Sequence, residues 1–116
     1  MIQLKRIYNN KKDESIRILV DRLWPRGISK KGADLDEWLK EIAPSNELRK
    51  WYSHDKNKWD EFKVRYKNEL SNKEELLKRI LEYEKNNNVT LLYASKDKEY
   101  NNAVILKEFI DEHKND

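Results

Sequence analysis

Two short stretches near the start of the chain alternate between apolar and polar side chains. Residues 2–8 (IQLKRIY) and residues 16–21 (IRILVD) both follow a period of two, which is typical of strands with one buried face. The polar loop between them, residues 9–15, is too short for a helical crossover. The two strands are therefore either antiparallel neighbours or not neighbours at all, and the pattern leaves both arrangements open.

From residue 34 onward, apolar positions recur every three or four residues, which predicts helices. Asp34, followed by Glu37 three residues later, is expected to cap a helix that reaches Ile42 and stops before Pro44. Ser45 is expected to cap a short helix after it. These two helices begin a helical block that separates the early strands from the last strand.

Two longer helices complete this block. Asp55 can cap the first of them, whose apolar stripe consists of Trp59, Phe62, Tyr66 and Leu70. Ser71 and Glu74 form a capping box for the second. The asparagines at 86–88 are expected to end it, because asparagine tolerates the left-handed conformation of a helix C-terminus.

The chain ends with one more strand and one more helix. Residues 89–94 (VTLLYA) are almost continuously apolar, which predicts a strand covered on both faces. Ser95 or Asp97 can then cap the last helix. We predict an α/β fold for residues 1–116: a single layered domain with a small, mostly parallel or mixed sheet of three to four strands, covered by about five helices.

Composition narrows the functional classes. The 116 residues suffice for one domain, and 41% of them are charged against 37% hydrophobic. Without cysteine, the chain has no disulfide, thiol nucleophile or thiolate metal site, and two glycines cannot build a dinucleotide or phosphate loop. We therefore expect no metal and no cofactor. No signal peptide or membrane span is evident, so a cytoplasmic protein without membrane association is expected.

Positive charge is concentrated in the first third of the chain. Residues 1–31 contain nine basic and three acidic residues, whereas the rest of the chain carries a small negative excess. Four of the seven arginines lie within the first 26 residues, although the chain otherwise prefers lysine. Arginine binds carboxylate or phosphate through two parallel hydrogen bonds, so its use here points to anion recognition.

The first candidate site is the segment from Asp21 to Gly27 (DRLWPRG), directly after the second strand. Its proline and glycine suit a tight turn and a stiff loop, which would limit the entropy lost on binding. Arg22 and Arg26 could clamp an anion beside Trp24, and Asp21 could orient an arginine or take a proton. The alternative interpretation is a local ion pair of Asp21 with Arg22 and a tryptophan that only fills the core.

Two further segments add candidates. Tyr93 and Lys96 follow the last strand, and ligands of open α/β sheets bind outside the carboxyl ends of strands. Asn101 and Asn102, one turn further on, could reach the same space. His54, which precedes Asp55 between two helical segments, could act as a general acid or base because its pKa lies near neutrality. Each of them has a simpler alternative, as a helix cap or a solvated side chain.

Several motifs together resemble a known family. The segments VDRLWPRG (20–27), WLKEIAPS (38–45), LRKW (48–51), the pair His54-Asp55, and TLLYA (90–94) closely resemble the YeaO-like branch of a bacterial family of unknown function, DUF488. The resemblance covers nearly the whole chain and implies a small α/β domain without an assigned activity. Relatives often carry histidines on both sides of the asparagine near the start of the last helix, where this chain has Tyr100-Asn101-Asn102. The resemblance therefore implies no metal here.

Two functional hypotheses follow. In the first, the strand ends form a pocket for a small anionic ligand that bears phosphate or carboxylate, with or without transfer or hydrolysis of that ligand. In the second, the basic N-terminal third binds nucleic acid or a protein partner, with Tyr8 and Trp24 as stacking surfaces. The two differ in burial, because a pocket hides Arg22 and Trp24 in a cleft and a binding platform exposes them. The sequence leaves the oligomeric state open.

Overall fold

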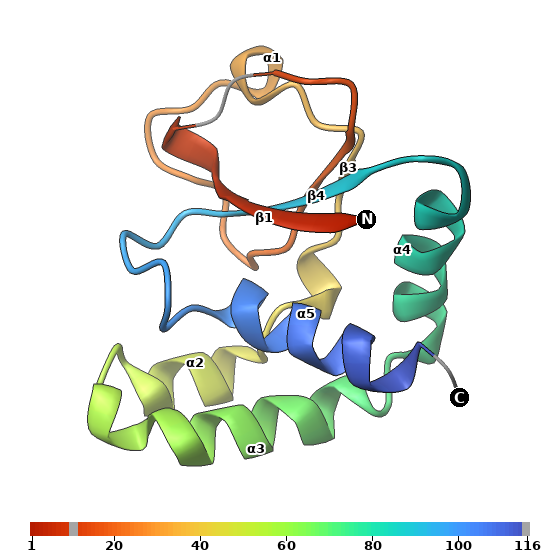
Figure 1. Cartoon of the computed structure of the whole chain (residues 1–116). Helices are drawn as coiled ribbons and strands as arrows, with labels where there is room; N and C mark the ends of the chain where they lie inside the picture. The colour runs from red at the N-terminus through yellow and green to blue at the C-terminus, as the bar shows by residue number, and fades with distance from the viewer. Residues whose placement is uncertain (10–11, 115–116) are drawn as a thin grey trace.

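A sheet of four parallel strands organises the computed structural model, which describes residues 1–9 and 12–114 (Figure 1). The strands are β1 (Ile2–Arg6), β2 (Ile16–Leu19), β3 (Glu37–Trp38) and β4 (Val89–Tyr93). Their order is β1-β4-β2-β3, and each neighbouring pair is parallel. This arrangement confirms the predicted α/β class and the small parallel sheet.

β4 lies between the two N-terminal strands. Leu91 of β4 is paired with Leu4 of β1 on one side and with Ile18 of β2 on the other. Of the two arrangements that the sequence left open, the one without direct pairing of β1 and β2 is therefore correct. Both edges of β4 are paired and all its residues are buried, as its nearly continuous apolar sequence predicted.

Five α-helices accompany the sheet in the described part of the chain: α1 (Lys30–Ala33), α2 (Asn46–Tyr52), α3 (Trp59–Leu70), α4 (Glu74–Asn86) and α5 (Asn102–His113). Three short 3-10 helices are also present, η1 (Ile7–Asn9), η2 (Lys40–Ile42) and η3 (Lys56–Lys58). Figure 1 shows α5 along one face of the sheet, α2 and α3 beyond it, and α1 on the opposite side.

The core is divided unequally between the two faces of the sheet. The larger cluster joins Ile18 and Leu91 to the apolar sides of α3, α4 and α5. On the other face, a small cluster of Ile7, Leu19, Ala33 and Leu92 is covered by α1 and loops. The carboxyl ends of the strands extend beyond both clusters, and the cavity of the candidate site lies there.

The helix predicted from Asp34 to Ile42 is wrong. Asp34 instead ends α1 in the left-handed conformation, at φ 50°, Glu37–Trp38 form β3, and only Lys40–Ile42 are helical, as η2. The Asp36 carboxylate accepts the Arg17 N–H at 2.8 Å, and the Asp36 and Leu39 N–H groups donate to carbonyls of β2. Pairing with the edge of β2 therefore outweighs the helical spacing of this segment, because it satisfies backbone groups that β2 would otherwise expose.

Several predicted helix ends also need correction. α4 begins at Glu74 after Lys73, and the Ser71 hydroxyl donates to the Asn68 carbonyl of the preceding helix instead of capping α4. α4 ends at Asn86 as predicted, but the following Asn87 is extended rather than left-handed.

The cap of α5 is Asn101, whose side chain accepts the Val104 N–H, whereas Ser95 or Asp97 was expected in that role. Asp97 accepts the N–H groups of Glu99 and Tyr100 and so closes the turn before the helix. Ser45 caps α2 as predicted. Asp55 was expected to cap the helix that carries Trp59, but it caps the short η3 before that helix, and α3 itself begins after Lys58 without a side-chain cap.

Candidate functional site

A cavity of about 590 Å³ lies at the carboxyl ends of β2 and β4. Its walls come from the loop after β2, the loop that leads into α2, the end of α2, and the segment between β4 and α5. Six of the residues proposed from the sequence line it, namely Asp21, Arg22, Trp24, Arg26, His54 and Asn101. The structure thus brings together segments about seventy residues apart along the chain.

Two proposed residues do not line this cavity. Tyr93 is 4% exposed and packs in the larger core cluster, where burial raises the pKa of its phenol. Lys96 is exposed in the turn after β4. Alternation explains the difference at Tyr93, because neighbouring residues of a strand point to opposite faces, and the next residue, Ala94, reaches the cavity instead.

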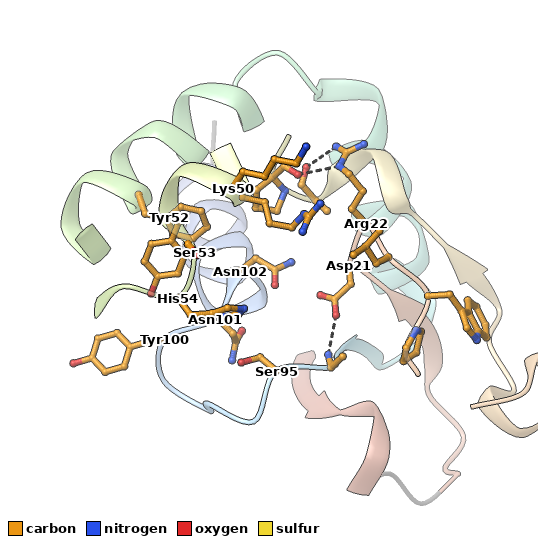
Figure 2. A pocket seen from close by; sticks show the side chains of 18 of the residues that line it. Asp21, Arg22, Lys50, Tyr52, Ser53, His54, Ser95, Tyr100, Asn101 and Asn102 are labelled. Carbon is orange, nitrogen blue, oxygen red and sulfur yellow. Dashed lines mark hydrogen bonds between the residues drawn. The ribbon is translucent and has the colours of Figure 1, made fainter. Parts of the chain in front are cut away.

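Asp21 occupies the wall formed by the strand ends. One of its carboxylate oxygens accepts the Ala94 N–H at 2.8 Å, which links the end of β2 to the end of β4. Figure 2 shows the other oxygen directed into the cavity beside Asn102. Burial raises the pKa of Asp21 above its ordinary value, while the Ala94 N–H and the Asn102 amide oppose this shift.

Arg22 faces away from the centre of the cavity and binds the wall behind it. Its Nε donates to the Pro44 carbonyl at 2.9 Å and its Nη2 to the Ala43 carbonyl at 3.0 Å. Nη1 lies 3.5 Å from the Glu41 carboxylate. The guanidinium is therefore occupied by the loop before α2, which differs from the free anion clamp proposed for Arg22.

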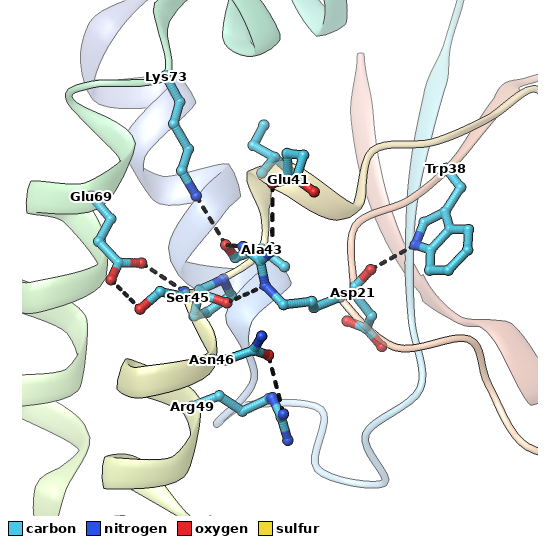
Figure 3. A network of polar contacts seen from close by, with 12 residues as sticks. Asp21, Trp38, Glu41, Ala43, Ser45, Asn46, Arg49, Glu69 and Lys73 are labelled. Carbon is cyan, nitrogen blue, oxygen red and sulfur yellow. Dashed lines mark hydrogen bonds and ion pairs between the residues drawn. The ribbon is translucent and has the colours of Figure 1, made fainter.

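The loop before α2 is held from several directions, as Figure 3 shows. Lys73 donates to the Ala43 carbonyl at 3.0 Å, from the residue before α4. Glu69 of α3 accepts from the Ser45 N–H at 2.8 Å and from the Ser45 hydroxyl at 2.6 Å. This network of charge-assisted hydrogen bonds fixes one wall of the cavity. The wall therefore loses little conformational entropy when a ligand binds.

The tryptophan-proline segment is anchored as well. The Trp24 indole N–H donates to the Ile28 carbonyl at 2.6 Å, and the Trp24 ring meets Trp38 edge-on at 5.2 Å between centroids. Gly27, at φ 77°, makes the turn that the sequence predicted for this segment. Arg26 follows on this rigid base, and its side chain is exposed.

The end of α2 supplies residues that the sequence analysis missed. Arg49, Lys50 and Ser53 line the cavity. Lys50 has no hydrogen-bond or ion-pair partner among the described residues, and Arg49 contacts only the Asn46 side chain, at 3.2 Å. A helical wheel places Arg49 beside the buried Leu48 and Tyr52. This position could have indicated that Arg49 borders the core side of α2, but not which other segments of the chain face it across the cavity.

Ser53 and His54 follow α2 in an unusual backbone conformation. Both have positive φ, 46° and 58°, although neither is glycine. A left-handed residue with a side chain is strained by roughly 1 kcal/mol or more, and such strain is concentrated at functional sites. The bend turns the exposed His54 toward the rim of the cavity, across from Asp21 (Figure 2).

The start of α5 contributes two asparagines with different roles. Asn101 is 4% exposed, and besides capping α5 it donates to the Asp97 carbonyl at 2.8 Å, so it is fully used by the fold. Asn102 donates from Nδ2 to the Val20 carbonyl at 3.0 Å. Its amide oxygen has no partner in the described ranges and adds an acceptor to the cavity beside Asp21.

The described residues contain no group of three histidine, aspartate, glutamate or cysteine side chains placed to hold a metal ion. Among the same residues, every helix is too short or too polar to cross a membrane.

Fold and site together define a parallel α/β domain with a cavity where open α/β sheets bind their ligands. The chain belongs to the DUF488 family, since the family model described as "Inactive DUF488-N3 subclade" matches residues 1–116. The predicted family is thereby confirmed, and the 43% identity to the YeaO protein given below confirms the YeaO-like branch.

Several curated proteins are similar to this chain. "Uncharacterized protein YeaO" of Escherichia coli is 43% identical over 110 residues, which cover 94% of this chain and 96% of that protein. "Uncharacterized protein Rv3073c" of Mycobacterium tuberculosis and "Uncharacterized protein Mb3100c" of Mycobacterium bovis are each 44% identical over 70 residues. These matches cover 60% of this chain and 59% of the mycobacterial proteins. No solved structure matches.

Proposed function

We propose that this protein binds a small anionic ligand, one that bears phosphate or carboxylate, in the cavity at the strand ends. The charge of the lining carries the proposal. Four cationic side chains border the cavity, namely Arg22, Arg26, Arg49 and Lys50, whereas Asp21 is the one acidic side chain among the described lining residues. The volume of about 590 Å³ is ordinary for a small-molecule site.

The cations differ in how free they are to bind a ligand. Arg22 is occupied by the loop before α2, so its role is to hold the wall. Arg26 and Lys50 have no side-chain partner among the described residues and are available to an anion. Arg49 can exchange its neutral contact with Asn46 for a charged one, which is about twice as strong.

Binding without turnover agrees best with the family. The description of the matching family model as an inactive subclade supports a chain that retains the cavity without catalysis. Asp21 and His54, the two candidate acid-base groups, lie on opposite sides of the cavity (Figure 2), which does not favour their joint action on one proton.

The nucleic-acid hypothesis finds less support in the same region. Arg17 is buried, and its guanidinium donates to the carbonyls of Ala33 and Asp34. The Arg6 guanidinium donates to the carbonyls of Ala94 and Ser95. Lys5 and Lys12 are engaged in ion pairs with Asp13 and Asp34. Much of the basic N-terminal third therefore serves the fold, which leaves few charges for phosphates of nucleic acid.

The proposal can be tested by thermal unfolding with inorganic phosphate, methyl phosphate and citrate. A ligand at ten times its Kd adds about 1.4 kcal/mol to the unfolding free energy, which corresponds to roughly 5 °C in Tm for a domain of this size. The double variant Arg26→Gln/Lys50→Gln is expected to abolish most of this shift. A protein whose Tm responds to none of these anions contradicts the proposal.

The matched control is Lys30→Gln/Lys31→Gln. It removes the same charge from exposed lysines of α1 that do not line the cavity. The control is expected to keep the full shift in Tm. If both double variants lose it equally, net charge rather than the cavity binds the anion, and the proposal fails.

A further inference from the structure

The cavity has two chemically different parts. Arg49 and Lys50 supply cations from the end of α2, and Arg26 adds a third from the loop after β2. The strand ends and the start of α5 supply hydrogen-bond acceptors across the cavity, namely the Asp21 oxygen that Ala94 does not use and the Asn102 amide oxygen beside it (Figure 2). An anion alone would use the first part and leave the second unpaired, so the ligand should carry a second kind of group.

The acceptors are held in place by the fold. Asp21 is fixed through the Ala94 N–H at 2.8 Å, and Asn102 through the Val20 carbonyl at 3.0 Å. Both partners are backbone groups at the ends of the two central strands, so the remaining oxygens keep their direction. Fixed acceptors in a partly buried site favour a ligand that donates hydrogen bonds to them, because unpaired buried polar groups are costly.

Charge decides between the possible donors. An ammonium group would suit an ionised Asp21 but would be repelled by the four cationic side chains around the cavity. A second anionic group would be repelled by Asp21 itself. A hydroxyl group is neutral and can both donate and accept, so it pairs with Asp21 in either protonation state. The raised pKa of Asp21 makes this property useful, since burial brings the two states closer in free energy at neutral pH.

The walls suit a ligand with several hydroxyl groups on a carbon frame. The aromatic rings of Trp24, Tyr52, Phe62 and Tyr100 line the cavity. Tyr52 and Phe62 stack at 4.1 Å between centroids, which makes that wall rigid. Aromatic faces bury the apolar C–H side of a polyol while its hydroxyl groups reach the polar residues.

We propose that the ligand is a hydroxylated phosphate ester of the sugar phosphate class, with its phosphate at Arg49 and Lys50 and its hydroxyl groups at Asp21 and Asn102. This inference rests on the proposed function, because it assumes that an anion binds in the cavity. It adds the chemistry of the rest of the ligand and an orientation for it.

Titration calorimetry can test the inference with four probes. Ribose 5-phosphate and glucose 6-phosphate carry both groups, methyl phosphate carries only the anion, and free glucose only the hydroxyls. We expect the sugar phosphates to bind at least tenfold more tightly than methyl phosphate, and free glucose not to bind measurably. Lys50→Gln should weaken methyl phosphate and the sugar phosphates by the same factor.

Two further variants separate the acceptors from the anion site. Asn102→Ala should reduce the preference for sugar phosphates over methyl phosphate severalfold and leave methyl phosphate binding unchanged. Asp21→Asn keeps an oxygen for the Ala94 N–H, so it should fold normally. Because its charge is gone and an amide N–H replaces the second carboxylate oxygen, it should bind methyl phosphate somewhat more tightly and lose part of the preference for sugar phosphates over methyl phosphate.

Each failure has a separate meaning. Equal affinity for methyl phosphate and the sugar phosphates overturns this inference and leaves the anion site in place. Adenosine monophosphate, as a competing probe, also overturns it if it binds more tightly than both sugar phosphates and does so equally well in Asn102→Ala. The absence of binding by any phosphate overturns the proposed function itself.

Discussion

Asp21 combines two demands that conflict at the level of a single residue. Its carboxylate accepts the Ala94 N–H and so joins the ends of β2 and β4. The same position removes the carboxylate from water, which raises its pKa. A group that is harder to ionise in the folded state than in the unfolded state lowers stability whenever it is ionised.

The substitution Asp21→Asn is therefore expected to stabilise the protein at pH 7. Asparagine retains an oxygen for the Ala94 N–H and removes the buried charge. The gain should shrink as the pH falls through the raised pKa of the folded state, and it should vanish below 3.8, the ordinary value, where Asp21 is protonated in both states. Urea unfolding from pH 3 to pH 7 measures this dependence.

Asp60→Asn is the control for this comparison. Asp60 is exposed in the first turn of α3, where a negative charge is favourable, so its replacement should cost a few tenths of a kcal/mol at pH 7. A constant gain for Asp21→Asn at every pH would contradict the role of burial at Asp21.

Ser53 offers a second prediction at the residue scale. It is left-handed at φ 46°, and its side chain makes no hydrogen bond to the described residues. Ser53→Gly should raise the free energy of unfolding by about 1 kcal/mol, because glycine adopts this conformation without strain. Chemical denaturation measures the gain. Ser71→Gly, at φ −61°, should instead lower stability, and a gain at both positions would contradict the assignment to strain.

At the scale of elements, α2 depends on its neighbour α3. Glu69 of α3 accepts two hydrogen bonds from Ser45, which is also the cap of α2. A helix of seven residues is too short to be stable on its own, so this contact and the buried Leu48 and Tyr52 hold it in place. The wall of the cavity that carries Arg49 is thus positioned by a residue outside the cavity.

Glu69→Ala is expected to lower the free energy of unfolding by about 1.5–3 kcal/mol, the range for hydrogen bonds to a charged group. Glu61→Ala, on the same helix, removes only the exposed pair with Arg65 and should cost at most about 0.5 kcal/mol. Denaturant unfolding of both variants makes the comparison. Equal losses would show that Glu69 contributes nothing beyond an ordinary surface pair.

Local patterns correctly predicted the helices whose cap and apolar stripe lie within one segment of the sequence. Ser45 acts as the predicted cap of α2, and α3 buries the predicted stripe of Trp59, Phe62, Tyr66 and Leu70. The segment after Asp34 could not be predicted in the same way, because its strand exists only through pairing with β2. Spacing along one segment contains no information about an edge that a distant segment offers.

The same limit applies to the whole molecule. The sequence identified β4 as the strand covered on both faces, and the structure places it at the centre of the sheet. The separation of β1 from β2 was left open, because it depends on β4 entering between them from about seventy residues away. At the candidate site, Asp21, Arg26 and His54 could be proposed because each has a signal in its own segment: a strand end, a turn and a histidine, respectively. Arg49 and Lys50 reach the cavity only through the packing of α2.

The two faces of the sheet should also differ in how they tolerate the loss of a buried side chain. Leu91 and Leu92 are neighbours in β4 and both are 0% exposed. Leu91 packs in the larger cluster between the sheet and α5, whereas Leu92 packs in the small cluster under α1 and loops. Truncating a buried leucine leaves an empty space, which packed helices keep open but a layer of loops can partly fill by collapsing. The loss in free energy of unfolding is smaller where such a collapse occurs.

We therefore expect Leu91→Ala to lower the free energy of unfolding by about 4 kcal/mol and Leu92→Ala by about 2–3 kcal/mol. Urea unfolding followed by tryptophan fluorescence gives both values, and the denaturant slope should be the same for the two variants. Hydrogen exchange supplies a second readout: Leu92→Ala should speed exchange mainly in α1 and the loops around it, and leave α3 and α5 close to the parent. Equal losses with exchange raised throughout would mean that both layers are equally rigid, and that the sheet and its two covers unfold as one unit.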